Sequence, residues 1–397
     1  MVDLAPMHVP AETPTRTAGT RHGVLLVSMS SLSVLGAVLL APVLPAVQET
    51  FEDTPGVTVL VPVMLTIPAL MIALLAPFAG SIVDRLGRKR LLVGSLVVYA
   101  VLGTAPLLLS SLPAIVATRA GVGIAEAAIM TCCTTLIVDY YQGAARNRWL
   151  GMQTVFAALA ATVFFALGGA LGSVSWRAPF WLYSVSLVFA VLAAVMIWQP
   201  VKPAAAADRV LPPFPWRVLL VPVLVTLFAG VVFYTPIVEL SFVLVEAGVT
   251  APAVIGAVGA ISSLATAAGG LAFPRVVDRR GTRTALVVAF ALAGSGLVVF
   301  AVSDSVPVLV AGVVVACLGT GLLLPTLLTW AVGSLTFDER GRGTGLWTSS
   351  LFIGNFICPL LVLALSGLLG GLSAAIVVIG VVSLAMVPVS RLVVRGA

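Results

Sequence analysis

The chain of 397 residues contains 60% hydrophobic residues, only 9% charged residues, and has a mean hydropathy of +1.17. A soluble domain carries about 25% charged residues, so this composition excludes a water-soluble globular protein and indicates that lipid is the solvent. The net charge of +6 requires no nucleic-acid partner, because basic residues that anchor a membrane protein on its cytoplasmic side account for it.

Twelve stretches are apolar enough and long enough to cross a membrane as helices, which takes about 20 residues each. They cover residues 23–46, 58–80, 91–109, 112–140, 150–173, 177–198, 215–242, 252–274, 284–302, 305–333, 343–368 and 371–393. A polar tail of residues 1–22 precedes them, and a Pro- and Ala-rich linker of residues 199–214 separates the sixth from the seventh. We therefore expect an all-α polytopic membrane protein with two six-helix bundles, residues 23–198 and 215–397.

The positive charges predict how these helices are oriented. Nearly all Lys and Arg residues lie in the N-terminal tail, in every second loop and at the C-terminus. The intervening loops hold only Arg177, and Arg119 lies inside an apolar stretch. Because basic residues collect at the cytoplasmic ends of membrane helices, we expect both termini to lie in the cytoplasm. The short loops favour a bacterial inner membrane.

An internal repeat relates the two bundles. A shift of 194 residues places the segment 84–87 (Asp-Arg-Leu-Gly) on the segment 278–281 (Asp-Arg-Arg-Gly). The same shift places Arg146 on Arg340 and Arg148 on Arg342. Two six-helix repeats are typical of transporters whose halves rock about a central site.

The loop at residues 80–90, Gly-Ser-Ile-Val-Asp-Arg-Leu-Gly-Arg-Lys-Arg, resembles the signature loop between helices 2 and 3 of the major facilitator superfamily. Glycines in such a loop allow a close helix approach and a tight reversal. Asp139 and Arg146 also resemble a pattern of that family after helix 4. The resemblance implies a conformational gate that links helices 2 and 11. The expected gating residues are Gly80, Asp84, Arg85, Gly87, Arg88, Asp139 and Arg146.

Arg119 and Glu126 are charges within the fourth apolar stretch. Each costs roughly 2.5–3.5 kcal/mol at the centre of a membrane helix, so each needs a reason to be there. Seven residues apart, they share a helix face and lie about 10 Å from each other, which is too far for a direct ion pair. Both could face one cavity, together with Met130. Alternatively, each could satisfy a polar backbone group on a neighbouring helix.

This stretch resembles the family's helix-4 motif, which is linked to proton transfer in drug–proton antiporters and begins with an Arg. A carboxyl at Glu126 in low-dielectric surroundings could then take up and release a proton near neutral pH. Glu239, expected about 33 Å along the seventh helix and near the outer surface, could line an external vestibule beside Tyr234. A solvated interfacial position for Glu239 is equally consistent with the sequence.

Two further helices bear on substrate and direction. Antiporters of the family carry Gly-Pro in helix 5, where this chain has Phe164-Phe165 followed by the paired glycines Gly168-Gly169. In helix 11, aromatic residues and one hydrogen-bonding amide at helical spacing could line a cavity, or the aromatic residues could pack against helices 8 or 10. The candidates are Trp347, Phe352, Asn355 and Phe356.

We therefore expect a secondary transporter, most simply a proton-coupled exporter of amphipathic compounds. The alternatives are a symporter that imports a small organic anion through Arg119 and, more remotely, a receptor that does not transport. No sequence motif for ATP binding or metal-dependent catalysis is present, so we expect no enzyme activity, cofactor or metal. The expected partners are a small-molecule substrate, protons and membrane lipids, around a monomer.

Overall fold

The computed structural model describes residues 18–200, 216–333 and 335–393. These residues form helices and connecting turns, without a strand among them. In the first part of the chain the helices are α1 (Thr20–Ser30), α2 (Leu32–Val38), η1 (Ala41–Val43), α3 (Leu44–Thr50), α4 (Val57–Leu75), α5 (Ala79–Leu86), α6 (Arg88–Thr104), η2 (Ala105–Leu107), α7 (Leu112–Tyr140), α8 (Gly143–Gly172), η3 (Ala178–Ser184) and α9 (Val185–Met196). The second part contains α10 (Trp216–Glu246), α11 (Pro252–Val302), α12 (Val306–Gly333), α13 (Phe337–Leu369) and α14 (Leu372–Val393).

The described residues contain 11 helical stretches that are long and apolar enough to cross a membrane. One of them, α11, has 51 residues and would be about 77 Å long if straight, more than twice the thickness of a bilayer core. Gly281 interrupts it with a φ of +78°, and the chain turns back at this point. α11 therefore supplies two crossings, and the prediction of twelve is confirmed.

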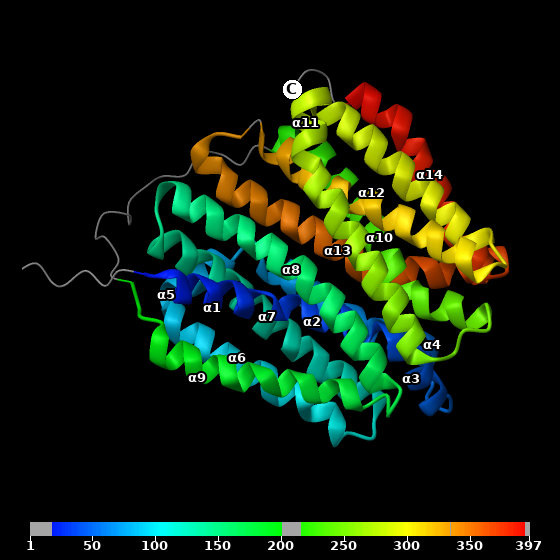
Figure 1. Cartoon of the computed structure of the whole chain (residues 1–397), viewed down its shortest axis with the longest axis horizontal. Coiled ribbons are helices and arrows are strands. Elements are labelled where there is room, and N and C mark those ends of the chain that lie inside the picture. Colours follow the sequence, from blue (N-terminus) through cyan, green and yellow to red (C-terminus); the bar gives the residue numbers. More distant parts are fainter. Residues whose placement is uncertain (1–17, 201–215, 334, 394–397) are drawn as a thin grey trace, which may run out of the picture.

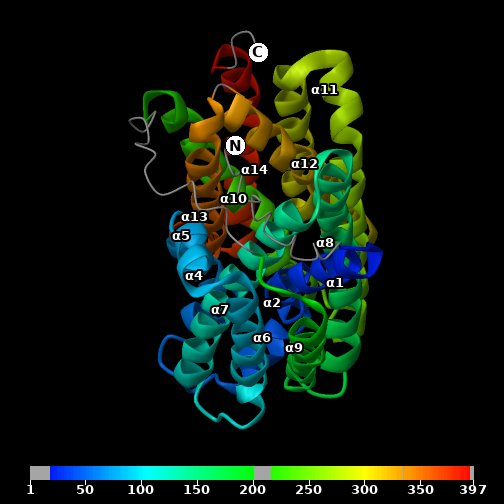
Figure 2. The same ribbon diagram turned by 90° about the vertical axis from the view of Figure 1, so that its left-hand side faces the viewer.

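The helices form two halves that lie side by side (Figures 1 and 2). The first half contains α1 to α9, and the second half contains α10 to α14. Most of the predicted linker, 201–214, lies outside the described residues, as do residues 1–17 of the predicted tail. The predicted all-α architecture with two six-helix bundles is confirmed.

The repeat predicted from the sequence has counterparts in backbone geometry. Gly87 and Gly281, which are 194 residues apart, both have a positive φ, +83° and +78°. Arg146 donates from Nε to the carbonyl of Tyr141, and Arg340 donates from Nε to the carbonyl of Leu335. Each arginine therefore contacts the carbonyl five residues before it, so the two halves repeat structure as well as sequence.

Two helix pairs supply the main contacts between the halves (Figure 2). In the first, α8 packs on α11 so closely that a Cβ on Gly169 would meet the backbone of Pro252 and Gly256. Gly168, the other of the paired glycines, lies against the Leu39 carbonyl of the first crossing, so the pair allows two close helix approaches. In the second, α4 packs on α13, and Ser349 donates to the carbonyl of Ala73 at 2.7 Å.

The first crossing is not one continuous helix. It breaks at Ser31 and again after Val38, before the prolines at 42 and 45. The hydroxyls of Ser30, Ser31 and Ser33 donate to carbonyls three residues earlier, a side-chain bond that competes with helix hydrogen bonds and bends helices. The short helix α2 is the segment between these two breaks.

The first helix begins three residues before the predicted first crossing, which started at residue 23. α1 begins at Thr20, so His22 belongs to the first turn of a helix rather than to the tail. The backbone N–H of Gly19 donates to His22 Nδ1 at 3.1 Å, and the ring lies edge-on to Trp198. The imidazole at the third helical position thus satisfies the N–H of the residue that precedes the helix, and this contact stabilises the first turn of α1.

Candidate functional site

Arg119 and Glu126 lie in the central part of α7, and both are buried. Their exposed fractions are 0% and 2%. Glu126 is fourteen residues, or about 21 Å, from the start of this 29-residue helix, so it lies at the middle of the crossing. Because charged groups at this depth are costly, their burial away from lipid indicates a specific role for both side chains.

Both side chains meet the first crossing at Gly36 of α2. Arg119 donates from Nη2 to the Gly36 carbonyl at 3.2 Å. The Glu126 carboxyl lies against the Gly36 Cα and leaves no room for a Cβ. Arg119 thus satisfies a backbone group on a neighbouring helix, which was one of the two alternatives for this residue. Arg119 and Glu126 of α7 therefore both contact the same residue, Gly36 of α2.

Two tyrosines complete the surroundings of these charges. The Tyr99 hydroxyl on α6 donates to the Leu32 carbonyl at 2.8 Å. The guanidinium of Arg119 lies 4.9 Å from the ring centroid of Tyr183, in a cation–π contact. The two tyrosine rings lie 5.1 Å apart. The sequence analysis missed both residues. Each is a tyrosine inside an apolar stretch, and that position could have indicated a buried polar contact.

Several polar atoms of this cluster have no hydrogen-bond partner within the described part of the chain. They are Oε1 of Glu126, Nε and Nη1 of Arg119, and the hydroxyl of Tyr183. Buried polar groups are normally satisfied, so unpaired ones in one place mark a strained or functional position. We call the residues Gly36, Tyr99, Arg119, Glu126 and Tyr183 the polar cluster.

Glu239 on α10 is buried as well, with an exposed fraction of 5%. Thr235, one turn earlier, contacts Cys358 of α13 at 3.5 Å between Oγ1 and Sγ. Burial of Glu239 disfavours the solvated interfacial position that the sequence left open. All four cysteines of the chain, Cys358 included, are free and buried.

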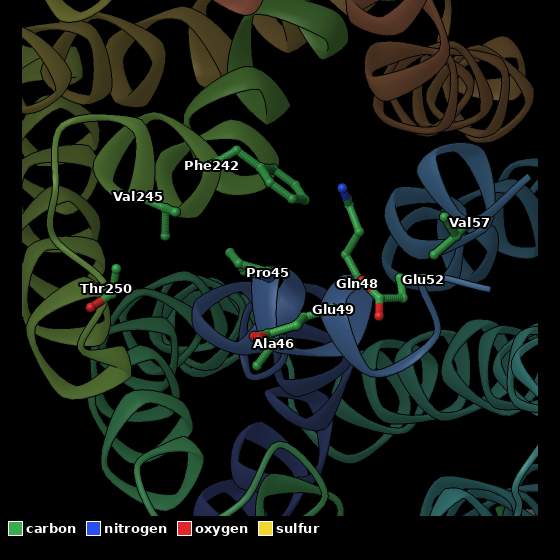
Figure 3. Close-up of a pocket in the computed structure, with 9 residues that line it drawn as sticks. All are labelled: Pro45, Ala46, Gln48, Glu49, Glu52, Val57, Phe242, Val245 and Thr250. Carbon is green, nitrogen blue, oxygen red and sulfur yellow. The ribbon is translucent and has the colours of Figure 1, made fainter. Parts of the chain in front are cut away.

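A pocket of about 500 Å³ lies one turn further along α10, between the two halves (Figure 3). Phe242 and Val245 of α10 face it from one side, and Glu49 and Glu52 from the other. Its remaining lining residues are Pro45, Ala46, Gln48, Val57 and Thr250. Glu239 and Tyr234 were predicted to line an external vestibule, but neither of them lines this pocket.

The predicted gating residues gather at the opposite end of the first half. Arg88 forms an ion pair with Asp139, which joins the start of α6 to the end of α7. The backbone N–H of Lys89 donates to Oε1 of Gln199 at 3.0 Å. Gln199 was missed by the sequence analysis, because it lies in the segment assigned to the linker. Arg85 is exposed, and the side chain of Asp84 lies outside the described residues.

Gly87 and Gly80 differ in what they require. Gly87 has a φ of +83° and makes the tight reversal between α5 and α6 that was predicted. A Cβ on Gly80, in contrast, would meet no described atom within 4 Å. The prediction that Gly80 allows a close helix approach is therefore wrong, because its helix leaves this position open.

The helix-11 candidates lie on α13, where Asn355 has a packing role. When its amide is oriented to suit its surroundings, the nitrogen donates to the carbonyls of Leu351 and Gly230, each at 3.1 Å. The backbones of Gly354 and Gly230 are also in contact there. The amide thus joins α13 to α10, the helix of the seventh crossing, whereas the alternative for the aromatic residues was packing against helices 8 or 10. The remaining candidates are half-buried: Met130, Trp347, Phe352 and Phe356.

Comparisons with known proteins agree with this architecture. The multidrug efflux protein YfmO of Bacillus subtilis (strain 168) is 28% identical over 346 residues, which cover 83% of this chain and 82% of the relative. The 3-(3-hydroxy-phenyl)propionate transporter of Escherichia coli (strain K12) is 28% identical over 284 residues, 68% of each chain. Both are similar to this chain across the two halves of the fold.

Solved structures show the same fold at lower identity. A bacterial homolog of the human lysosomal transporter Spinster, in an inward-facing and occupied conformation, has a TM-score of 0.72 and 16% identity, and the match covers 94% of this chain and 95% of that chain. The human organic anion transporter MFSD10 (TETRAN) has a TM-score of 0.68 and 18% identity, with 93% and 99% covered. The sequence profile of the Major Facilitator Superfamily matches residues 26–251 and 223–396. The chain is therefore a multi-pass membrane transporter that belongs to the Major Facilitator Superfamily.

Proposed function

We propose that this transporter is a proton-coupled exporter of small amphipathic compounds that works by alternating access. The observation that carries the proposal is the position of Glu126, a buried carboxyl at the middle of α7 with one oxygen unpaired. Arg119 accompanies it on the same helix and shares its contact with Gly36. A carboxyl within the membrane is a functional group by default, because it is expensive to keep there.

Two opposing influences act on this carboxyl. Removal from water disfavours its charged form, whereas the nearby guanidinium of Arg119 favours that form. A balance of this kind lets a small change in the surroundings bind or release a proton. In the proposed cycle, protonation of Glu126 from outside and substrate binding from inside exclude each other, so each drives the other across.

The contacts between the halves supply a means of alternation. The ion pair of Arg88 with Asp139 and the bond of Lys89 to Gln199 tie together the ends of three helices in the first half. The contact of Ser349 with Ala73 joins that half to the second. In the proposed cycle the contact of Ser349 with Ala73 breaks and reforms as the halves rock, while the contacts within the first half hold the loop at residues 80–90, to which we assign a gating role.

The relatives support export without deciding it. The relative that matches over 346 residues carries the name multidrug efflux protein. Phe164 and Phe165 stand where antiporters of the family carry Gly-Pro, and Phe165 packs against Gly259 of the second half. We propose that this packing takes over the helix contact at this position, so that antiport remains possible without the Gly-Pro pair.

Proton flux in everted membrane vesicles tests the proposal. Vesicles energised to be acid inside are challenged with a panel of lipophilic cations and small organic anions. Wild type should release protons with a lipophilic compound, and Glu126→Gln, which keeps the shape but cannot ionise, should abolish the release. Asp304→Asn is the matched control, because Asp304 is exposed in the turn between α11 and α12. Proton release that survives Glu126→Gln contradicts the proposal.

One observation favours a second function, the import of a small organic anion with protons. Arg119 has two nitrogens without a partner among the described residues, and a guanidinium binds carboxylates in bidentate geometry. One relative is named as a transporter of a hydroxyphenyl propionate. Anion-dependent proton movement that survives Glu126→Gln and fails in Arg119→Lys would establish this function instead.

The membrane setting completes the proposal. We propose a bacterial inner membrane with both termini in the cytoplasm, a monomeric transporter, and no bound cofactor. The alternation of basic loops supports this orientation. Reaction of a cysteine introduced at Arg395 with an impermeant thiol reagent, in everted vesicles but not in intact cells, checks the side of the C-terminus.

A further inference from the structure

The short helix α2 is the one described element that contacts both the polar cluster and the second half through its backbone carbonyls. It lies between the breaks of the first crossing, so its last carbonyls depend on partners from outside the helix. Near the C-terminal end of α2, Gly36 and Ala37 supply two consecutive carbonyls. The partners of these two carbonyls come from different halves of the protein.

On one side, α2 contacts the charged side chains of the polar cluster, which belong to α7. The Gly36 carbonyl accepts from Nη2 of Arg119 at 3.2 Å, and the Glu126 carboxyl presses on the Gly36 Cα. At the start of α2, the Leu32 carbonyl accepts from the Tyr99 hydroxyl. A movement of Glu126 or Arg119 toward Gly36 would therefore meet the backbone of α2 directly.

On the other side, α2 contacts Tyr234 of α10. The Tyr234 hydroxyl donates to the Ala37 carbonyl at 3.4 Å, a long bond that a small shift can break. Tyr234 is 3% exposed, so its hydroxyl cannot turn to bulk water instead. The next residues of the first crossing are held as well, because the Leu39 carbonyl lies against Gly168 of α8.

We propose that α2 couples the charge of Glu126 to the contact between the halves, with Gly36 as the residue that senses the carboxyl and Tyr234 as the residue that receives the change. The inference rests on the proposed function in one respect: it takes Glu126 as the proton site. When Glu126 is charged, Arg119 is held near it and near Gly36. When Glu126 is neutral, this attraction is lost, α2 shifts, and the bond from Tyr234 to Ala37 changes.

The groups that face Glu126 come from four elements. They are Arg119 on α7, Tyr99 on α6, Tyr183 on η3 and Tyr234 on α10. Arg119 stays charged and the phenols stay neutral over the physiological pH range, so Glu126 is the group of this set that can change its charge there. The two-state element that coupling requires is the discontinuous first crossing.

A distance between the halves, measured against pH without any substrate, tests the inference. Spin labels are attached to cysteines introduced at Thr50 and Thr250, which are exposed at the outer ends of the two halves. The native cysteines are buried, and protein without introduced cysteines is the labelling blank. Wild type should show a distance distribution that shifts with pH, and Glu126→Gln should lose the shift.

Tyr234→Phe decides the proposal, because it removes the hydroxyl and keeps the ring. We expect this variant to lose at least half of the pH-dependent shift. Tyr140→Phe is the control, since it loses the hydrogen bonds of its hydroxyl with the backbone carbonyl and N–H of Trp198 at the other end of the protein and should keep the whole shift. Size-exclusion profiles of all variants verify folding, and Tyr234→Leu is a second variant that should lose the shift as well.

The outcomes separate this inference from the proposed function. If Tyr234→Phe and Tyr234→Leu keep the wild-type shift while Glu126→Gln loses it, α2 does not transmit the change and only the inference fails. If Glu126→Gln keeps the shift, Glu126 is not the group that α2 senses, and the inference is overturned. Wild type without any shift also overturns it, and in both cases the vesicle experiment decides the function independently.

Discussion

Gly36 and Glu126 are in direct contact between α2 and α7, with no space for a Cβ between them. The Glu126 carboxyl can occupy this position because Gly36 of α2 has no side chain there. Most glycines in a membrane helix allow two backbones to approach, whereas this one makes room for a buried charge.

Gly36→Ala should displace the Glu126 carboxyl and reduce proton coupling. Misplacement of a reacting group by about 1 Å can cost roughly 100-fold, so we expect proton flux to fall by about 10- to 100-fold. Gly94→Ala is the control, because a Cβ there would meet no described atom within 4 Å. Flux in everted vesicles and thermal stability are measured on the same preparations. Wild-type flux in Gly36→Ala would show that the position of the carboxyl is unimportant.

Arg88 and Asp139 should be energetically coupled. Their side chains are 18% and 23% exposed, so the pair is partly shielded from solvent. We expect a coupling free energy of about 1 kcal/mol in a double-mutant cycle of Arg88→Ala and Asp139→Asn. The measurement is thermal unfolding in detergent at low and high salt, and salt should weaken the coupling. Additive single effects would mean that the pair does not stabilise this conformation.

Gly87 and Gly281 should not tolerate a side chain. Both have a positive φ, which costs roughly 1–2 kcal/mol for a residue with a Cβ. Gly87→Ala and Gly281→Ala should each lower the thermal midpoint, whereas Gly80→Ala in the same loop should not. An equal loss in Gly80→Ala would contradict the open surroundings of Gly80. An unchanged midpoint in Gly281→Ala would contradict the reversal in α11.

Asn355→Leu should destabilise the protein without changing which compounds it transports. The substitution removes two side-chain hydrogen bonds to carbonyls that keep their backbone bonds within α13 and α10, and each such bond contributes about 0.5–1.5 kcal/mol. Thermal unfolding measures the loss, and a substrate panel in vesicles measures the preference. A changed preference at unchanged stability would return Asn355 to the wall of a substrate cavity.

Much of the fold follows from the sequence because a membrane imposes simple constraints. Segment length and charge placement predict twelve crossings, and the structure contains them. The 194-residue shift predicts the repeat. The positive φ of both Gly87 and Gly281 shows why the repeat can be detected in the sequence. Because a positive φ favours glycine, the same backbone turn in the two halves places a glycine at the same position of both repeats.

The sequence by itself determined the class of protein, the number of crossings and the presence of two charges within the fourth crossing, because each depends on composition or on local spacing. Only the tertiary structure decided what surrounds those charges. Gly36, Tyr99 and Tyr183 lie far from Glu126 in the chain, and they meet it only because four helices pack together. Helical spacing relates residues of one helix, whereas a site between helices depends on rotations and breaks, such as those around α2, that no local pattern records.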